Sequence, residues 1–287
     1  MLLSKFARDT TAVPTGDGHY DLTVDAGWAI YLGPNGGYVA ALAARALCAE
    51  AERAMDGPEI RHLRSLNTHF LSPLSTGALT AEVQVERSGR SVGIASAILR
   101  QGDETGVMAR AAFTAPRAGI DLAHQPPPRV PPPEDLPPLE MYIPPGFRDR
   151  YERRWAIGPM PHSLADVPLA GGWIRLARTE SGSPAVTLDA PLLVAYSDCW
   201  FPALYAMTPP TTRVYTVDLT VHLVTPIPAG YDDWVLVEFQ GVQAADGLVV
   251  EDGRIWSRGG ELLAISRQLA VVRTESGGPT APASRRP

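Results

Sequence analysis

The sequence predicts an α+β fold in which two tandem copies of one unit, each a helix wrapped by an antiparallel sheet, pack as a pseudo-dimer. The first observation is an internal repeat, because LNTHFLSP at 66–73 and LTVHLVTP at 219–226 align with their histidines and prolines in step. The second is that three strand-like runs follow each copy, and a small-residue apolar run suited to a buried helix precedes it. A repeat of this size indicates two structurally equivalent units.

The first unit is expected to occupy residues 1–117. Residues 18–30 alternate enough to form an opening strand. The turn GPNGG at 33–37 leads into an Ala- and Leu-rich run at 38–55, which has no internal proline or glycine and predicts the clearest helix of the chain. Strands then fill 63–117, separated by turns that contain proline or glycine.

A Pro-rich segment at 118–147 separates the two units, since it holds 10 of the 28 prolines of the chain. Such a segment cannot form a helix or a central strand, so we expect an extended and fairly stiff linker. The second unit, 148–273, should begin with an edge strand and contain a helix over 188–207 before its own set of strands. The tail at 274–287 is expected to be disordered.

Composition is that of an ordinary soluble protein, with 45% hydrophobic and 20% charged residues. The net charge of −6 gives no support to nucleic-acid binding, which usually needs a strongly basic face. The N-terminus lacks the apolar core of a signal peptide, and no run approaches the roughly 18 apolar residues of a membrane span. Cys48 and Cys199 lie in apolar runs, which favours buried reduced thiols. We therefore expect a cytoplasmic enzyme or binding protein without a membrane partner.

Five segments in order carry a resemblance to a known family: GPNGGYVAALAARAL, LNTHFLSP with the downstream VERSGRS, AYSDCWF, YTVDLTVHLVTP and SRQLAVV. With the Pro-rich linker between them, the chain from about 18 to 273 resembles the acyl-CoA thioesterase II (TesB-like) family, whose fold is a double hotdog. The resemblance implies a thioester hydrolase of lipid metabolism that acts on acyl-CoA and needs no cofactor. It leaves a homo-oligomer, a dimer or a tetramer, open.

The resemblance also implies the catalytic residues, because in this family an Asp, a Ser or Thr and a Gln hold and activate a water. Carried over by motif, these are Asp198, Thr216 and Gln268. A desolvated carboxylate is a competent general base, and a hydroxyl with a carboxamide can orient water without adding charge. Thr220, four residues on, is the alternate hydroxyl. Asp218 would share the strand face of both threonines and is the alternate base, although we expect it to be structural.

The two units differ at these positions. Aligned on the shared His-Pro strand, Gln268 falls opposite Phe113, and Asp198 falls roughly opposite the Tyr-Val-Ala run after Gly37. A carboxylate among apolar neighbours is costly to bury without a partner, which favours a functional Asp over a surface one. His69 and His222 occur in both units, so we expect them to serve packing or bonding within the strand, because one active site does not require two copies.

Two further features complete the expected site. The backbone N–H groups of Gly36 and Gly37, at the start of the first helix, are candidates to stabilise an oxyanion. Arg87 and Arg90, in the turn ERSGRS, are candidates for coenzyme A phosphates, with two solvated turn arginines as an equal alternative. No metal-ligand spacing, GxSxG elbow or Gly-rich phosphate motif is present.

Two alternatives to a thioesterase remain. A hydratase or dehydratase of the same fold uses a His with a carboxylate near the helix, and neither predicted helix contains a His. A non-catalytic acyl-CoA or fatty-acyl binding protein would keep the tunnel without turnover, but it has no need of an Asp, Thr and Gln set. The sequence leaves open the acyl chain, and whether coenzyme A or an acyl carrier protein carries it.

Overall fold

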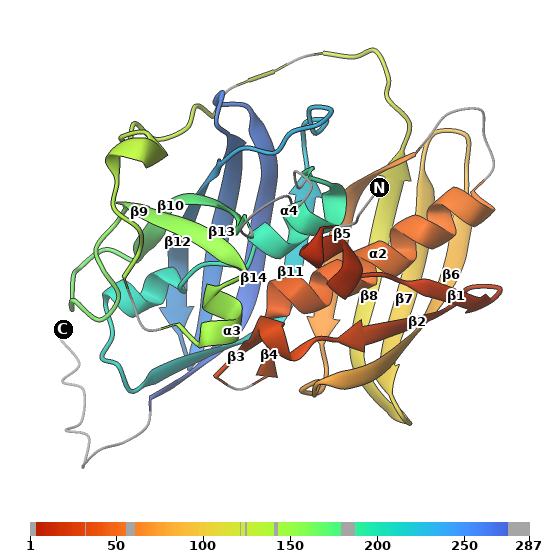
Figure 1. Ribbon diagram of the computed structural model, residues 1–287, viewed down its shortest axis with the longest axis horizontal. Helices are drawn as coiled ribbons and strands as arrows, with labels where there is room; N and C mark the ends of the chain where they lie inside the picture. Colours follow the sequence, from red (N-terminus) through yellow and green to blue (C-terminus); the bar gives the residue numbers. More distant parts are fainter. Residues whose placement is uncertain are drawn as a thin grey trace.

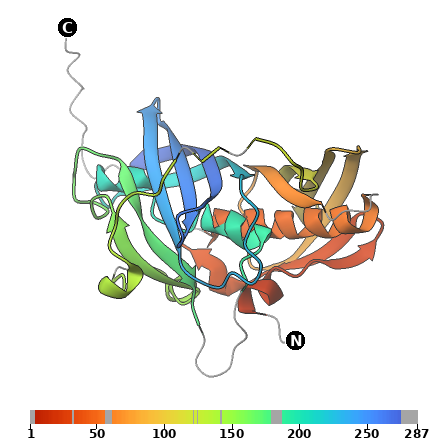
Figure 2. The same ribbon diagram turned by 90° about the horizontal axis from the view of Figure 1, so that it is seen from above.

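Twelve antiparallel strands form one continuous sheet that curves around two central helices, as Figures 1 and 2 show from perpendicular directions. This computed structural model describes residues 4–31, 33–55, 61–120, 122–123, 125–140, 143–178 and 187–274. Neighbouring strands follow the order β1 (Val13–Gly16), β2 (His19–Val24), β6 (Gly77–Ser88), β7 (Gly93–Gln101), β8 (Glu104–Thr114), β5 (His62–Phe70), β11 (Thr212–Leu223), β14 (Leu262–Thr274), β13 (Leu248–Ser257), β12 (Val235–Ala245), β10 (Leu169–Leu176) and β9 (Tyr151–Ile157). The expected tail from 275 onward lies outside the described residues.

The remaining elements are short, apart from one long helix. They are α1 (Lys5–Asp9), η1 (Ala26–Trp28), the paired strands β3 (Ala29–Ile30) and β4 (Gly33–Pro34), α2 (Gly36–Ala54), η2 (Pro133–Asp135), α3 (Pro145–Arg148), α4 (Ala190–Tyr196) and η3 (Ala203–Ala206). Among the described residues, no helix is long and apolar enough to cross a membrane.

The helix α2 lies in the concave face of the first unit's strands, as predicted for 38–55. Its small residues have high helix propensity and allow the sheet and α4 to approach closely. Leu42 and Leu47 are fully buried. The side chain of Asn35 caps the helix by accepting a hydrogen bond from the Tyr38 N–H at 3.1 Å.

The repeat is structural, and its pseudo-two-fold axis can be located from strand register. β5 and β11 pair at the centre of the sheet, with Asn67 opposite Thr220, its own counterpart in the repeat. Leu66 pairs with Val221 and Thr68 with Leu219, so the register is symmetric about that point. The Asn67 Nδ2 donates a hydrogen bond to Thr220 Oγ1 at 2.7 Å across the axis. The two sheets are therefore joined into one by a central antiparallel pair.

Two predicted elements are too long. The opening strand stops at Val24, because the Asp25 side chain accepts a hydrogen bond from the Gly27 N–H at 2.8 Å and begins η1. The helix predicted over 188–207 stops at Tyr196. Ser197 donates its hydroxyl to the Val194 carbonyl at 2.7 Å, and Pro202 has no N–H to continue the helix. Asp198 therefore lies in a turn after α4 and not inside a helix.

Strand register also corrects the alignment of the two units. Leu66 pairs with Ala111, and its repeat counterpart Leu219 pairs with Gln268. The counterpart of Gln268 is therefore Ala111 and not Phe113.

The counterpart of Asp198 changes as well when the two helices are aligned on their N-caps, Asn35 and Asp189. Asp198 then corresponds to Ala44, nine residues after the cap, and not to the run after Gly37. The second unit thus has polar side chains where the first has two alanines.

The Pro-rich linker packs on the outer face of the second unit. The Trp173 Nε1 donates a hydrogen bond to the Pro131 carbonyl at 2.9 Å, and the Trp256 Nε1 donates one to the Gln125 carbonyl at 3.1 Å. Val130 and Leu136 pack against the same apolar cluster. These contacts fix the course of the linker around 125–136, whereas its last residues Ile143, Pro144 and Phe147 line the cavity between the two units. The expectation that the segment forms no helix is wrong at its end, because α3 begins at Pro145, and proline is tolerated in the first turn of a helix. Cys48 and Cys199 are free thiols, and Cys199 is buried as predicted, whereas Cys48 is only half-buried.

Leu42→Ala should lower the free energy of unfolding by about 2–5 kcal/mol, because it opens a cavity between α2 and the sheet. Urea denaturation of the full chain measures this change. Leu122→Ala, at a position 84% exposed, is the matched control and should change the stability little. Equal effects of the two substitutions would contradict a core centred on α2.

Candidate active site

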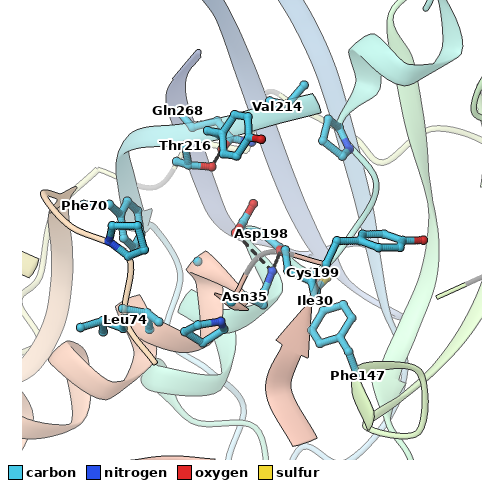
Figure 3. Close-up of a pocket in the computed structure, with 18 of the residues that line it drawn as sticks. Ile30, Asn35, Phe70, Leu74, Phe147, Asp198, Cys199, Val214, Thr216 and Gln268 are labelled. Atoms are coloured by element: carbon cyan, nitrogen blue, oxygen red, sulfur yellow. Dashed lines mark hydrogen bonds between the residues drawn. The ribbon is translucent and has the colours of Figure 1, made fainter. Parts of the chain in front are cut away.

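A cavity of about 520 Å³ opens where the two units meet, between the start of α2, the turn after α4 and the ends of β5 and β11 (Figure 3). This volume is typical of sites for small ligands. Its mouth includes Tyr31 and Leu71, which are 63% and 50% exposed. Its interior is mostly apolar and includes the buried Val39 and Val107.

Asp198 lies in the wall of this cavity and is held by the first unit. Its Oδ2 accepts hydrogen bonds from the Gly37 N–H at 2.9 Å and from Asn35 Nδ2 at 3.3 Å. Asn35 Nδ2 also donates to the Asp198 carbonyl at 2.7 Å, which fixes the turn after α4. Burial raises the pKa of the Asp198 carboxyl to about 7, although the bonds from Gly37 and Asn35 act in the opposite direction.

The two glycines at the start of α2 make this contact possible. A Cβ on Gly36 would lie 2.7 Å from Asp198 Oδ2, and a Cβ on Gly37 would lie 2.6 Å from the Ala195 carbonyl oxygen. Any larger residue would therefore separate α2 from α4. We expected both glycine amides to face an oxyanion, but the Gly37 amide already donates to Asp198.

Thr216 and Gln268 lie across the cavity from Asp198 (Figure 3). The Thr216 hydroxyl donates to Gln268 Oε1 at 2.9 Å, and Gln268 Nε2 donates to Glu251 Oε1 at 2.8 Å. The other oxygen of Glu251 accepts from the Ala203 N–H at 2.6 Å. Because a carboxylate accepts and does not donate, this chain fixes which end of the Gln268 amide points at Thr216.

A β-bulge turns Thr216 toward the cavity. The register of β11 against β14 shifts between Thr216, opposite Ala270, and Asp218, opposite Leu269. Without the extra residue, Thr216 would share the outer face with Asp218, as we expected from simple alternation. That expectation is wrong. Thr220 binds Asn67 on the pseudo-two-fold axis, and neither it nor Asp218 lines the cavity.

The arginines expected to bind coenzyme A lie elsewhere. Arg87 and Arg90 are exposed at the β6–β7 turn. In that hairpin, a Cβ on Gly93 would meet Met55, which caps the C-terminal end of α2. The cavity is at the other end of this helix, roughly 28 Å away at 1.5 Å per residue. A turn motif does not reveal which end of a helix it will approach. His69 and His222 do not line the cavity, and both are exposed on the strands, so the expected packing role is wrong.

Two polar residues in and around the cavity escaped the sequence reasoning. Glu251 is 4% exposed, and burial raises the pKa of its carboxyl to about 7. The alternation of β13 could have revealed it, because Val249, Glu251 and Ile255 occupy the core-facing positions. Arg153, also 4% exposed, lines the cavity from β9. The described residues contain no group of three or more His, Cys, Asp or Glu side chains that could hold a metal ion.

The pseudo-symmetry creates a second junction between the helices, and this one holds an ion pair. There the N-cap of α4, Asp189, contacts Arg45 Nη2 of α2 at 2.8 Å. This junction mirrors the contact between Asn35 and the turn at Asp198. The described residues therefore place an acid, a hydroxyl and a carboxamide around a cavity at one of the two junctions.

Comparison with known families assigns both units of the chain. The model of the acyl-CoA thioesterase N-terminal domain matches residues 24–115, and that of the acyl-CoA thioesterase C-terminal domain matches residues 125–272. The chain belongs to the acyl-CoA thioesterase family. Among curated proteins, none matches the sequence of this family member.

Solved structures similar to this thioesterase-family chain include a candidate thioesterase II from Thermobifida fusca YX, with 26% identity, TM-score 0.80 and coverage of 95% of this chain and 99% of the other. A hot dog protein of unknown function from Alicyclobacillus acidocaldarius has 23% identity, TM-score 0.82 and coverage of 96% and 100%. Acyl-CoA thioesterase II TesB2 from Mycobacterium marinum has 21% identity, TM-score 0.71 and coverage of 95% and 100%. The predicted double hotdog fold is thus confirmed.

The raised pKa of Asp198 predicts a pH-dependent stability. Because the pKa is about 7 in the folded state and 3.8 for the free group, folding favours the protonated acid, and stability falls as pH rises between these values. Asp198→Asn removes this loss. The difference in unfolding free energy, Asp198→Asn minus wild type, should therefore become more positive from pH 4 to pH 8, by up to about 4 kcal/mol. Urea titrations at several pH values test this, and a difference independent of pH would contradict a buried ionisable Asp198.

Proposed function

We propose that this protein hydrolyses acyl-CoA thioesters to a free acid and coenzyme A, with Asp198 as the general base for a water. The observation that carries this proposal is the position of a partly buried carboxylate across a ligand-sized cavity from the Thr216–Gln268 pair. A base whose pKa is near the working pH is well suited to take a proton from water.

The hydrogen-bond directions assign a task to each polar group. Since the Thr216 hydroxyl donates a hydrogen bond to Gln268, its oxygen can accept a hydrogen bond from the water. The Gln268 Nε2, which already donates to Glu251, has a second hydrogen that can be donated to the water oxygen. With one water proton directed at Asp198, a lone pair of the water is left for attack on the thioester carbon.

The reaction then needs two proton transfers. As the water oxygen bonds to the carbonyl carbon, its proton passes to Asp198 and negative charge develops on the carbonyl oxygen. The Gly36 amide, at the start of α2 and in the cavity wall, is the candidate donor to that oxygen. When the carbon–sulfur bond breaks, Asp198 returns the proton to the departing thiolate.

Asp198→Asn should reduce the turnover of acyl-CoA by about 10²–10⁴-fold, because it removes the base while preserving the size of the side chain. Release of the coenzyme A thiol measures turnover, and calorimetry should find acyl-CoA binding retained. Asp218→Asn, the same change outside the cavity, is the control and should keep wild-type turnover. Full activity of Asp198→Asn with loss in Asp218→Asn would transfer the role to Asp218. Wild-type binding without turnover would indicate an acyl-CoA binding protein.

Gln268→Ala should reduce kcat by roughly tenfold, because one hydrogen bond that orients the water is lost. This reduction is smaller than that expected for Asp198→Asn, which removes the base. Glu251→Gln should act in the same direction, because an amide cannot accept from both Gln268 and the Ala203 N–H in the present geometry. The comparison is Gln243→Ala on β12, which lies outside the cavity and should leave kcat unchanged. A Gln268→Ala loss as large as that of Asp198→Asn would contradict this division of roles.

A further inference from the structure

Arg153 differs from the other arginines in the described part of the chain because it alone is buried, with 4% of its surface exposed. It extends from the edge strand β9 into the cavity wall. Its guanidinium lies over the rings of Phe147 and Tyr151, at 4.9 and 4.7 Å from the ring centroids. Its hydrogen bond to the protein is a long one, from Nη2 to the Cys199 carbonyl at 3.3 Å.

No acid within the described residues forms an ion pair with Arg153. Some partly buried arginines have such partners, with Arg175 bound to Glu152 at 2.7 Å and Arg254 bound to Glu238 at 3.3 Å. Others in the described part of the chain, such as Arg154, lack one but are more exposed than Arg153. A guanidinium has five N–H donors and keeps its charge in proteins. A buried charge without a counter-ion is unfavourable, and aromatic rings offset only part of this cost. The position therefore suits an anion supplied by a ligand.

The location of Arg153 indicates which part of the ligand would supply that anion. Its guanidinium contacts the backbone of the residue next to Asp198, and Phe147 beside it lines the same cavity. The mouth is formed by exposed residues such as Tyr31, whereas Arg153 is in the interior. Phosphates of coenzyme A would remain toward the mouth, so the acyl chain is the part that reaches Arg153.

We propose that Arg153 binds a carboxylate at the far end of the acyl chain, so that the preferred substrates are ω-carboxyacyl thioesters and not simple fatty acyl thioesters. This inference rests on the proposed function. A guanidinium matches the planar geometry of a carboxylate and can form charge-assisted hydrogen bonds with it. The apolar side chains of the cavity would contact the methylene groups between the two ends of the acyl chain.

The test compares length-matched pairs of thioesters: hexanoyl-CoA with adipoyl-CoA, and octanoyl-CoA with suberoyl-CoA. For at least one pair, we expect the wild-type kcat/KM to be roughly tenfold or more higher for the ω-carboxy member, the effect of a charge-assisted hydrogen bond. Arg153→Met should abolish this preference, mainly through KM, while turnover of the saturated member persists. Arg153→Lys should retain part of it.

Arg154→Met is the matched control, because Arg154 is the next residue on β9, lies over the Trp234 ring at 5.2 Å and does not line the cavity. It should keep the wild-type preference. A wild-type enzyme that favours the saturated member of both pairs, or a preference that survives in Arg153→Met, would overturn the proposal.

Calorimetry with Asp198→Asn separates this proposal from the proposed function and does not depend on the folding of an Arg153 variant. Tighter binding of the ω-carboxy member supports the role of Arg153 even if the wild-type protein hydrolyses no thioester, a result that would refute the thioesterase activity. Hydrolysis of both members with equal rates and equal binding would refute the role of Arg153 and leave the thioesterase activity standing.

Discussion

The contact between the start of α2 and the end of α4 is the constraint on which the rest of the structure depends. It requires two consecutive glycines, because the carboxylate of Asp198 and the carbonyl of Ala195 occupy the space of a Cβ at these positions. The same contact joins the two units, closes one wall of the cavity and gives the Asp198 carboxylate its hydrogen-bond donors. Packing and site chemistry therefore rest on the same few atoms.

This arrangement places opposing effects on one carboxyl group. Burial favours its neutral form, whereas the Gly37 amide and the Asn35 side chain favour the ion. The result is an acid that can change its charge near neutral pH. Across the cavity, a second buried acid, Glu251, holds the Gln268 amide in one orientation. The two carboxyl groups thus share a raised pKa but face different partners.

The overall architecture could be predicted from the sequence because the repeat and its strand patterns are local signals. The strands after each His-Pro segment, the long Ala-rich helix and the Pro-rich linker all depend on composition and period. The errors occurred where a single side chain overrides the pattern. Ser197 and Pro202 shorten α4, Asp25 ends the first strand, and a bulge before Asp218 reverses the face of Thr216.

The site could be predicted only as far as motifs reached. Asp198, Thr216 and Gln268 were found by resemblance, and all three line the cavity. Glu251 could have been found from the alternation of β13, because it occupies a core-facing position. Arg153 could not, because a buried charge in an edge strand looks like any other polar residue until its neighbours are known. The arginines of the β6–β7 turn were misplaced because the position of a hairpin along a helix depends on strand order, which sequence does not state.

The Asn67–Thr220 pair on the pseudo-two-fold axis has a consequence for the whole molecule. In a dimer of identical chains, any substitution near the axis appears twice, so both helix junctions must carry the same residues. Fusion into one chain removes this obligation. One junction can hold a desolvated acid, which lowers stability near neutral pH, while the other holds the Arg45–Asp189 ion pair. In the fused chain, one helix junction can therefore carry the buried acid and the other the stabilising ion pair. In a symmetric dimer, both junctions would have to carry the same residues.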